Sequence, residues 1–117
     1  MLPRRMCVIC GGGTYKSYYC RPCGDVAQEI RFSAHAIVLR AVKAGILSPA
    51  GAARCVDCGG PASQYDHRRY SEPLRVDATC PKCNRARGVA WDLPELIALL
   101  RPMPRAEYLA YWRAKNP

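Results

Sequence analysis

The pattern of apolar and polar positions predicts one long helix in the first half of the chain. A helical repeat runs from Asp25, a suitable N-cap, to about Lys43, and Gly45 is placed to end it. The polar stripe of this helix is narrow, and the apolar arc is wider than one buried face needs, so we expect the helix to lie between two other modules. The arc contains Ile30, Phe32, His35, Ile37, Val38, Leu39, Ala41 and Val42. Within it, His35 is expected to be structural.

Shorter patterns follow on either side of this helix. Residues 62–79 predict a long hairpin that bends near residues 71–73, because Leu74, Val76 and Ala78 alternate with polar positions. Residues 14–19 allow a tight hairpin. Three short helices are predicted near the C-terminus, at 84–87, at 96–101 with its start at residues 92–95, and from Pro104 onward. Their apolar residues are expected to pack on the second half of the chain.

The eight cysteines form four pairs, each with two residues between its members. A Cys-x2-Cys pair bends around one tetrahedral ion, and two pairs complete a four-cysteine shell of the kind that holds structural zinc. The shortest loops are closed by two groups, one of Cys7, Cys10, Cys20 and Cys23 and the other of Cys55, Cys58, Cys80 and Cys83. Two structural Zn²⁺ ions are therefore predicted, and metal is expected to be a condition of folding.

The sequence gives less support to other roles for these cysteines. Disulfides are typical of secreted chains, and the N-terminal residues lack the apolar run of a secretory signal. A redox pair would be expected in a thioredoxin-like βαβ context, which the pattern does not contain. Iron–sulfur ligation fits four cysteines in principle and stays open as an alternative. We therefore expect a cytoplasmic chain with reduced, metal-bound thiols.

Composition limits the classes of protein further. The chain has 117 residues, enough for one domain or two very small modules, and it contains no apolar run of about 18 residues that could span a membrane. Lys and Arg number 18 against 9 Asp and Glu, which gives a formal net charge of +9. Eight thiolates with two Zn²⁺ add −4 and bring +9 to +5. The metal-bound chain is therefore still basic, which favours an anionic partner.

The segment between the second two cysteine pairs carries a possible catalytic site. It reads Tyr65-Asp66-His67-Arg68-Arg69-Tyr70-Ser71-Glu72-Pro73-Leu74-Arg75-Val76, and the last pair is followed directly by Asn84. This arrangement resembles the ββα-metal site of HNH endonucleases, and more closely the small HNH-like, treble-clef zinc proteins frequent in bacteriophage genomes. The resemblance covers residues 55–88 and implies a phage-encoded protein acting in a bacterial host.

The resemblance also implies roles for three residues. In HNH enzymes the residue matching His67 activates water, and the residues matching Asp66 and Asn84 bind a catalytic divalent ion, here Mg²⁺ or Mn²⁺. The family carries a middle asparagine that orients the histidine, but residues 68–79 contain none. A backbone carbonyl in the turn at residues 70–73 would have to take over that role. Asp66 could equally pair with an arginine, and we expect a retained scaffold without catalysis.

Basic residues provide the leading functional hypothesis. Six cations lie in one stretch of twenty residues, namely Arg68, Arg69, Arg75, Lys82, Arg85 and Arg87. Such a group typically neutralises nucleic-acid phosphates, although a solvated face without a partner is the alternative. Residues 15–21 also interleave aromatic and basic side chains, as single-strand binders do.

Together these patterns predict a small zinc-stabilised α+β fold. Two four-cysteine treble-clef or zinc-knuckle modules flank a central helix, and the C-terminus is helical. The modules divide into residues 1–47 and 48–117. The predicted function is nucleic-acid binding by an accessory protein, with DNA favoured over RNA. The alternatives are an active metal-dependent HNH endonuclease and a module that binds a host protein to modulate transcription or defence.

Overall fold

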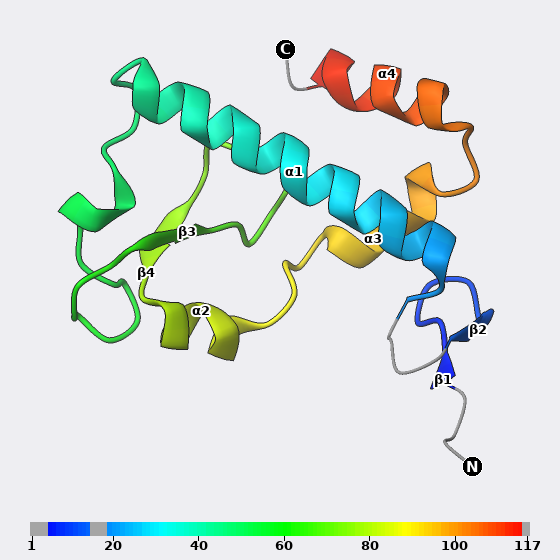
Figure 1. The fold of residues 1–117 in the computed structure, drawn as a ribbon, viewed down its shortest axis with the longest axis horizontal. Helices are drawn as coiled ribbons and strands as arrows, with labels where there is room; N and C mark the ends of the chain where they lie inside the picture. The colour runs from blue at the N-terminus through cyan, green and yellow to red at the C-terminus, as the bar shows by residue number, and fades with distance from the viewer. Residues whose placement is uncertain (1–4, 15–18, 116–117) are drawn as a thin grey trace. The chain divides into compact units, whose positions relative to one another are not determined.

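Residues 5–14 and 19–115 are described by a computed structural model, in which they form four α-helices and two antiparallel sheets (Figure 1). The helices are α1 (Arg21–Lys43), α2 (Pro81–Arg87), α3 (Leu93–Leu100) and α4 (Arg105–Lys115), and a 3₁₀ turn, η1, spans Ala50–Ala52. Strand β1 (Arg5–Met6) pairs with β2 (Gly13–Thr14), and β3 (Gln64–Asp66) pairs with β4 (Asp77–Thr79). The predicted hairpin at 14–19 and the basic and aromatic segment at 15–21 fall largely on residues 15–18, outside the described residues.

The chain divides into two compact units. The first joins Met1–Arg31 to Leu93–Pro117, and the second spans Phe32–Asp92, so helix α1 contributes to both. Helices α3 and α4 therefore group with the first cysteine set, whereas the sequence assigned them to the second, with a division between residues 47 and 48. Each unit contains one of the two cysteine sets.

Helix α1 begins earlier than predicted. The N–H of Gly24 already donates to the carbonyl of Cys20 at 2.8 Å, and Pro22 needs no N–H partner in a first turn. Asp25 is therefore not the N-cap, because the helix must start directly after Cys20 to carry Cys23 in its first turn. The predicted end is confirmed, since Gly45 adopts a φ of 78° just beyond the last turn.

The buried face of α1 is a narrow stripe. It starts at Cys23 and recurs every three or four residues along one face of the helix, at Val26, Ala27, Ile30, Ala34, Val38 and Ala41. The wide buried arc predicted from the sequence is wrong, because Phe32 and Leu39 are 65% and 55% exposed and His35 is exposed as well. Cys23 belongs to the buried stripe, so the cysteine cluster fixes the rotation of the helix and turns the larger apolar residues outward.

The core of the first unit is built from three helices. Val26 and Ile30 of α1 are buried, as are Leu93, Ile97 and Leu100 of α3 and Tyr108 and Trp112 of α4. Arg105 of α4 donates to the Glu29 carboxylate of α1 at 2.9 Å. Helix α3 begins at Leu93, within the start predicted at residues 92–95, with Pro94 in its first turn, where a proline is tolerated.

The second unit is built around a short hairpin. Gln64 faces Thr79, and Asp66 faces Asp77, so the paired strands are only three residues long. The predicted alternation from Leu74 onward is wrong, since Leu74 is 46% exposed. Backbone bonds from Glu72 to Arg69 and from Arg75 to Glu72 hold this stretch in consecutive turns instead of a strand.

Helix α2 begins at Pro81, three residues before its predicted start. Cys80 is its N-cap, and the Cys80 sulfur accepts from the N–H of Cys83 at 3.4 Å. The cysteine pair therefore starts the helix and supplies its cap.

The fold is thus a small mixed α/β arrangement with two four-cysteine clusters, as predicted at that level. Within the part of the chain that the structure describes, no helix is both long and apolar enough to cross a bilayer.

Candidate metal centres and basic pocket

The eight cysteines gather into the two groups that their spacing predicted. Within each group all four sulfurs lie within 4.8 Å of one another. The Sγ atoms of Cys10 and Cys20 are 3.6 Å apart, and those of Cys58 and Cys80 are 3.9 Å apart. A ligand distance of about 2.3 Å places the sulfurs of a tetrahedral zinc site about 3.8 Å apart, whereas a disulfide needs about 2.05 Å. All eight cysteines are free thiols. Each group therefore has the dimensions of a tetrahedral metal site.

The first cysteine pair of each group lies in the same backbone turn. Cys7 N–H donates to the Gly12 carbonyl at 2.6 Å, and Cys55 N–H donates to the Gly60 carbonyl at 2.8 Å. Gly11 and Gly59 both adopt a φ of 76°, in the left-handed region that favours glycine. The repeated Cys-x2-Cys-Gly-Gly sequence thus folds twice into one type of knuckle, whose two sulfurs lie within 4.8 Å of those of the second cysteine pair in the group.

The peptide groups around the sulfurs favour their charged form. Backbone N–H groups of Cys80, Cys58 and Asp57 lower the pKa of the Cys55 thiol to about 6. Burial raises the pKa of the Cys7 thiol, but N–H groups of Cys10, Cys20 and Ile9 outweigh burial and lower it to about 6. Thiolates are the form that binds metal.

Two thiols, Cys23 and Cys83, are instead held in their neutral form. The pKa of Cys83 is raised to about 12, first by the Cys80 sulfur and then by burial. Burial followed by the neighbouring thiols raises the pKa of Cys23. Four sulfurs at this separation repel one another as thiolates, and a divalent ion among them reverses that effect. Each group could therefore hold one zinc ion as a closed set of four ligands.

Asp66, one of the residues matched to a catalytic metal ligand, is committed to two arginines. Its carboxylate accepts from Arg68 Nε at 2.6 Å and Nη2 at 3.1 Å, and from Arg87 Nη1 at 2.9 Å. The side chain of Asp66 is only 8% exposed. The oxygens that a divalent ion would need are thus occupied by guanidinium groups.

His67 is oriented by the backbone, as the missing asparagine required. Its Nε2 lies 2.8 Å from the Pro73 carbonyl, which can only accept, so Nε2 carries the proton. Its ring stacks on Tyr70 with the ring centroids 5.1 Å apart. Burial lowers the pKa of His67, although the Pro73 bond and the carboxylates of Asp66 and Asp92 raise it, and His35 lowers it slightly.

Asn84 does not join Asp66. Its Nδ2 on α2 donates to Gln64 Oε1 on β3 at 2.8 Å. The structure thus contains an oriented histidine beside a carboxylate that is paired with arginines, and this geometry does not favour the alternative of an active endonuclease. Whether the chain cleaves nucleic acid is a question for the nicking assay described below.

The six predicted phosphate-binding cations separate into two kinds. Arg68 makes five hydrogen bonds, two to Asp66 and three to the carbonyls of Arg87, Gly88 and Val89, so all its donors are used. Arg87 bonds three carboxylates, those of Asp57, Asp66 and Asp77, and they raise its pKa. These two arginines hold the unit together from inside.

The other four cations face solvent. Arg69, Arg75, Lys82 and Arg85 are all exposed. Among the described residues, the one ion pair found for this set joins Arg75 to Glu72 at 3.5 Å, between side chains that are 80% and 49% exposed. Such a contact is weak and screened by water. Their charge is therefore available to a ligand.

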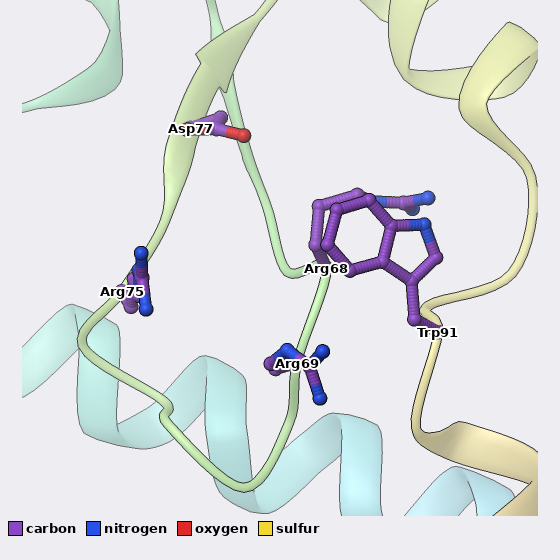
Figure 2. Close-up of a pocket in the computed structure, with 5 residues that line it drawn as sticks. All are labelled: Arg68, Arg69, Arg75, Asp77 and Trp91. Carbon is purple, nitrogen blue, oxygen red and sulfur yellow. The ribbon is translucent and has the colours of Figure 1, made fainter.

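A pocket of about 420 Å³ lies where two of these cations meet the hairpin (Figure 2). Its lining residues are Arg68, Arg69, Arg75, Asp77 and Trp91. Trp91 was not recognised from the sequence. It is one of two tryptophans and stands outside every amphipathic pattern, between Gly88 and Pro94, which is the signal that could have identified it. The guanidinium carbons of Arg68 and Arg69 lie 5.9 Å and 5.7 Å from its ring centroid.

Comparisons with protein-family models, with curated proteins and with solved structures found no match for this chain.

Proposed function

We propose that this protein is a zinc-stabilised nucleic-acid-binding protein. Both cysteine groups would hold Zn²⁺ in closed shells of four thiolates, and such shells stabilise a fold without offering an open position for catalysis. The arrangement of Asp66 between two arginines supports a scaffold that is HNH-like in its sequence but does not cleave. Binding, not hydrolysis, is then the task of the exposed cations.

The observation that carries this proposal is that two exposed arginines, with no ion pair beyond the weak one of Arg75 to Glu72 among the described residues, line one pocket. Arg69 and Arg75 line it, and the carboxylate of Asp77 beside them accepts a hydrogen bond from Arg87 and is ion-paired with it. Lys82 and Arg85 flank Cys83 on α2, where a zinc–thiolate centre would carry a charge of −2. Part of their charge is offset by that centre, so Arg69 and Arg75 supply the larger share of the attraction for phosphate.

The salt dependence of binding tests this proposal. Four phosphate contacts give a slope of about −3.6 for log K against log salt on duplex DNA, which weakens binding roughly 150-fold between 50 and 200 mM salt. Fluorescence anisotropy with a labelled oligonucleotide measures this slope. The double variant Arg69→Ala/Arg75→Ala should bind more weakly and reduce the slope by about 1.8.

Arg101→Ala is the matched control, because Arg101 is exposed and lies in the first unit. It removes one charge outside the pocket, so its salt slope should match that of the unmodified protein. If neither single-stranded nor duplex DNA or RNA binds at low salt, the proposal fails and a protein partner becomes the better hypothesis. A plasmid-nicking assay with Mg²⁺ and Mn²⁺ on the same samples should show no cleavage.

A further inference from the structure

Trp91 is fixed at its backbone and open at its ring. Its N–H donates to the Arg68 carbonyl at 2.8 Å. The next residue, Asp92, is buried and accepts from the N–H groups of Tyr70 and Ser71 at 2.8 Å and 2.9 Å. The segment that carries the indole is thereby attached to the loop that carries Arg69. Trp91 is nevertheless 64% exposed.

Exposure of a rigidly placed indole beside cations is typical of a stacking surface. The guanidinium carbons of Arg68 and Arg69 lie 5.9 Å and 5.7 Å from the centroid of the Trp91 ring, close to the limit of about 6 Å for a cation–π contact, so they do not cover the ring closely. In Figure 2 the ring of Trp91 borders the same space as Arg69 and Arg75. An aromatic plane next to the exposed guanidinium groups of Arg69 and Arg75 matches a planar base attached to a phosphate.

Asp77 adds a third type of group to the pocket. One of its oxygens accepts from Arg87 Nη1 at 2.8 Å, and its side chain is 46% exposed. Within the described residues the other oxygen has no hydrogen-bond donor, so it can accept from a base amino group or a sugar hydroxyl. The pocket volume of about 420 Å³ lies within the range of small-ligand sites.

We propose that this pocket takes one unpaired nucleotide, with its base on Trp91, its phosphate at Arg69 and Arg75, and a donor group at Asp77. This inference rests on the proposed function and names the form of nucleic acid that the site prefers. A base within a duplex is stacked on both faces and offers only its edges in the grooves. An unpaired base has a free face, so the protein binds single strands in preference to duplexes.

The test compares three ligands with one set of variants. The ligands are a single strand of about 12 nucleotides, the matched duplex and adenosine 5′-monophosphate. The variants are Trp91→Ala, Trp91→Phe and, as a matched control, Phe32→Ala, since Phe32 is exposed to the same degree at 65% and does not line the pocket. Circular dichroism checks that each variant folds.

We expect Trp91→Ala to weaken single-strand binding roughly 5- to 150-fold while duplex binding changes little. Trp91→Phe should keep most of the affinity, and Phe32→Ala all of it. Intrinsic fluorescence gives an independent readout, because Trp112 is buried at 5% exposure and Trp91 is not. In a Trp112→Phe background, single strands should quench the emission of Trp91.

The outcomes separate this inference from the function on which it rests. Equal affinity for single strand and duplex, unaffected by Trp91→Ala and without quenching, overturns the nucleotide pocket while salt-dependent binding persists. Absence of oligonucleotide binding by the unmodified protein overturns the proposed function. In that case, saturable quenching by adenosine 5′-monophosphate would identify a free nucleotide as the ligand.

Quenching by the single strand and not by adenosine 5′-monophosphate identifies a strand as the ligand of the pocket.

Discussion

Replacing Arg87 with alanine should destabilise the second unit far more than replacing any exposed arginine. Arg87 donates to Asp57 in the cysteine knuckle, to Asp66 in β3 and to Asp77 in β4, at distances of 2.7 to 2.9 Å. Its side chain is 16% exposed and that of Asp66 is 8% exposed. One guanidinium therefore connects the metal-binding knuckle, both strands and α2, and its pair with Asp66 is little screened by water.

The expected loss follows from what the alanine leaves behind. Removing one partner of a buried ion pair costs about 3–5 kcal/mol. Asp66 keeps its bonds to Arg68, and Asp57 and Asp77 are partly exposed, so we expect the lower end, about 3 kcal/mol. For a chain of 117 residues this corresponds to a fall in melting temperature of about 12 °C.

Thermal and urea unfolding, followed by circular dichroism at one fixed excess of Zn²⁺, measure this loss. Arg75→Ala is the control, because its ion pair with Glu72 is long and exposed, and such pairs contribute about 0–1 kcal/mol. Arg87→Lys should fall between the two, since an ammonium cannot reproduce the forked contact with Asp57. A loss for Arg87→Ala within about 1 kcal/mol of that for Arg75→Ala would refute the reasoning.

Two further predictions concern buried polar groups. Thr79 is fully buried and its hydroxyl has no hydrogen-bond partner among the described residues, so Thr79→Val should raise the free energy of unfolding by about 1 kcal/mol in urea titrations. A loss of stability would show that the hydroxyl has a partner, such as a metal-bound sulfur. Burial lowers the pKa of His67, so the unfolded chain takes up a proton below about pH 6.5 that the folded chain does not. The free energy of unfolding therefore decreases as the pH is lowered below about 6.5, by up to about 1.4 kcal/mol per pH unit from this group. A parallel pH series with His67→Gln should lack that part of the slope.

The sequence predicted what depends on neighbouring residues. The cysteine groups were recognised because each pair and its glycines form one local turn, and the short loops leave one simple pairing. The end of α1 at Gly45 and the existence of α2, α3 and α4 followed from caps, prolines and periodicity in the same way. The predicted start of α1 is wrong because Asp25 has the side chain of an N-cap, whereas the helix begins at Arg21 and carries Cys23 in its first turn.

The remaining features depend on contacts that are distant in the sequence. Arg87 meets carboxylates that lie 10, 21 and 30 residues away, and the Arg68 donors reach carbonyls 19 to 21 residues away. From the sequence both were counted as surface cations like their neighbours. The outward position of Phe32 and Leu39 and the place of Trp91 in a pocket likewise follow from tertiary packing, which periodicity does not contain.

The metal content of the folded protein tests the central claim most directly. Native mass spectrometry with elemental analysis, on protein purified without chelator, should give two zinc ions per chain. Removing them with a chelator should abolish the folded far-ultraviolet circular dichroism spectrum, because metal-binding free energy is folding free energy in a chain of this size. Two zinc ions lost together with the fold is the result that we predict. Iron with labile sulfide, fewer than two zinc ions, or a metal-free protein that stays folded would contradict the account.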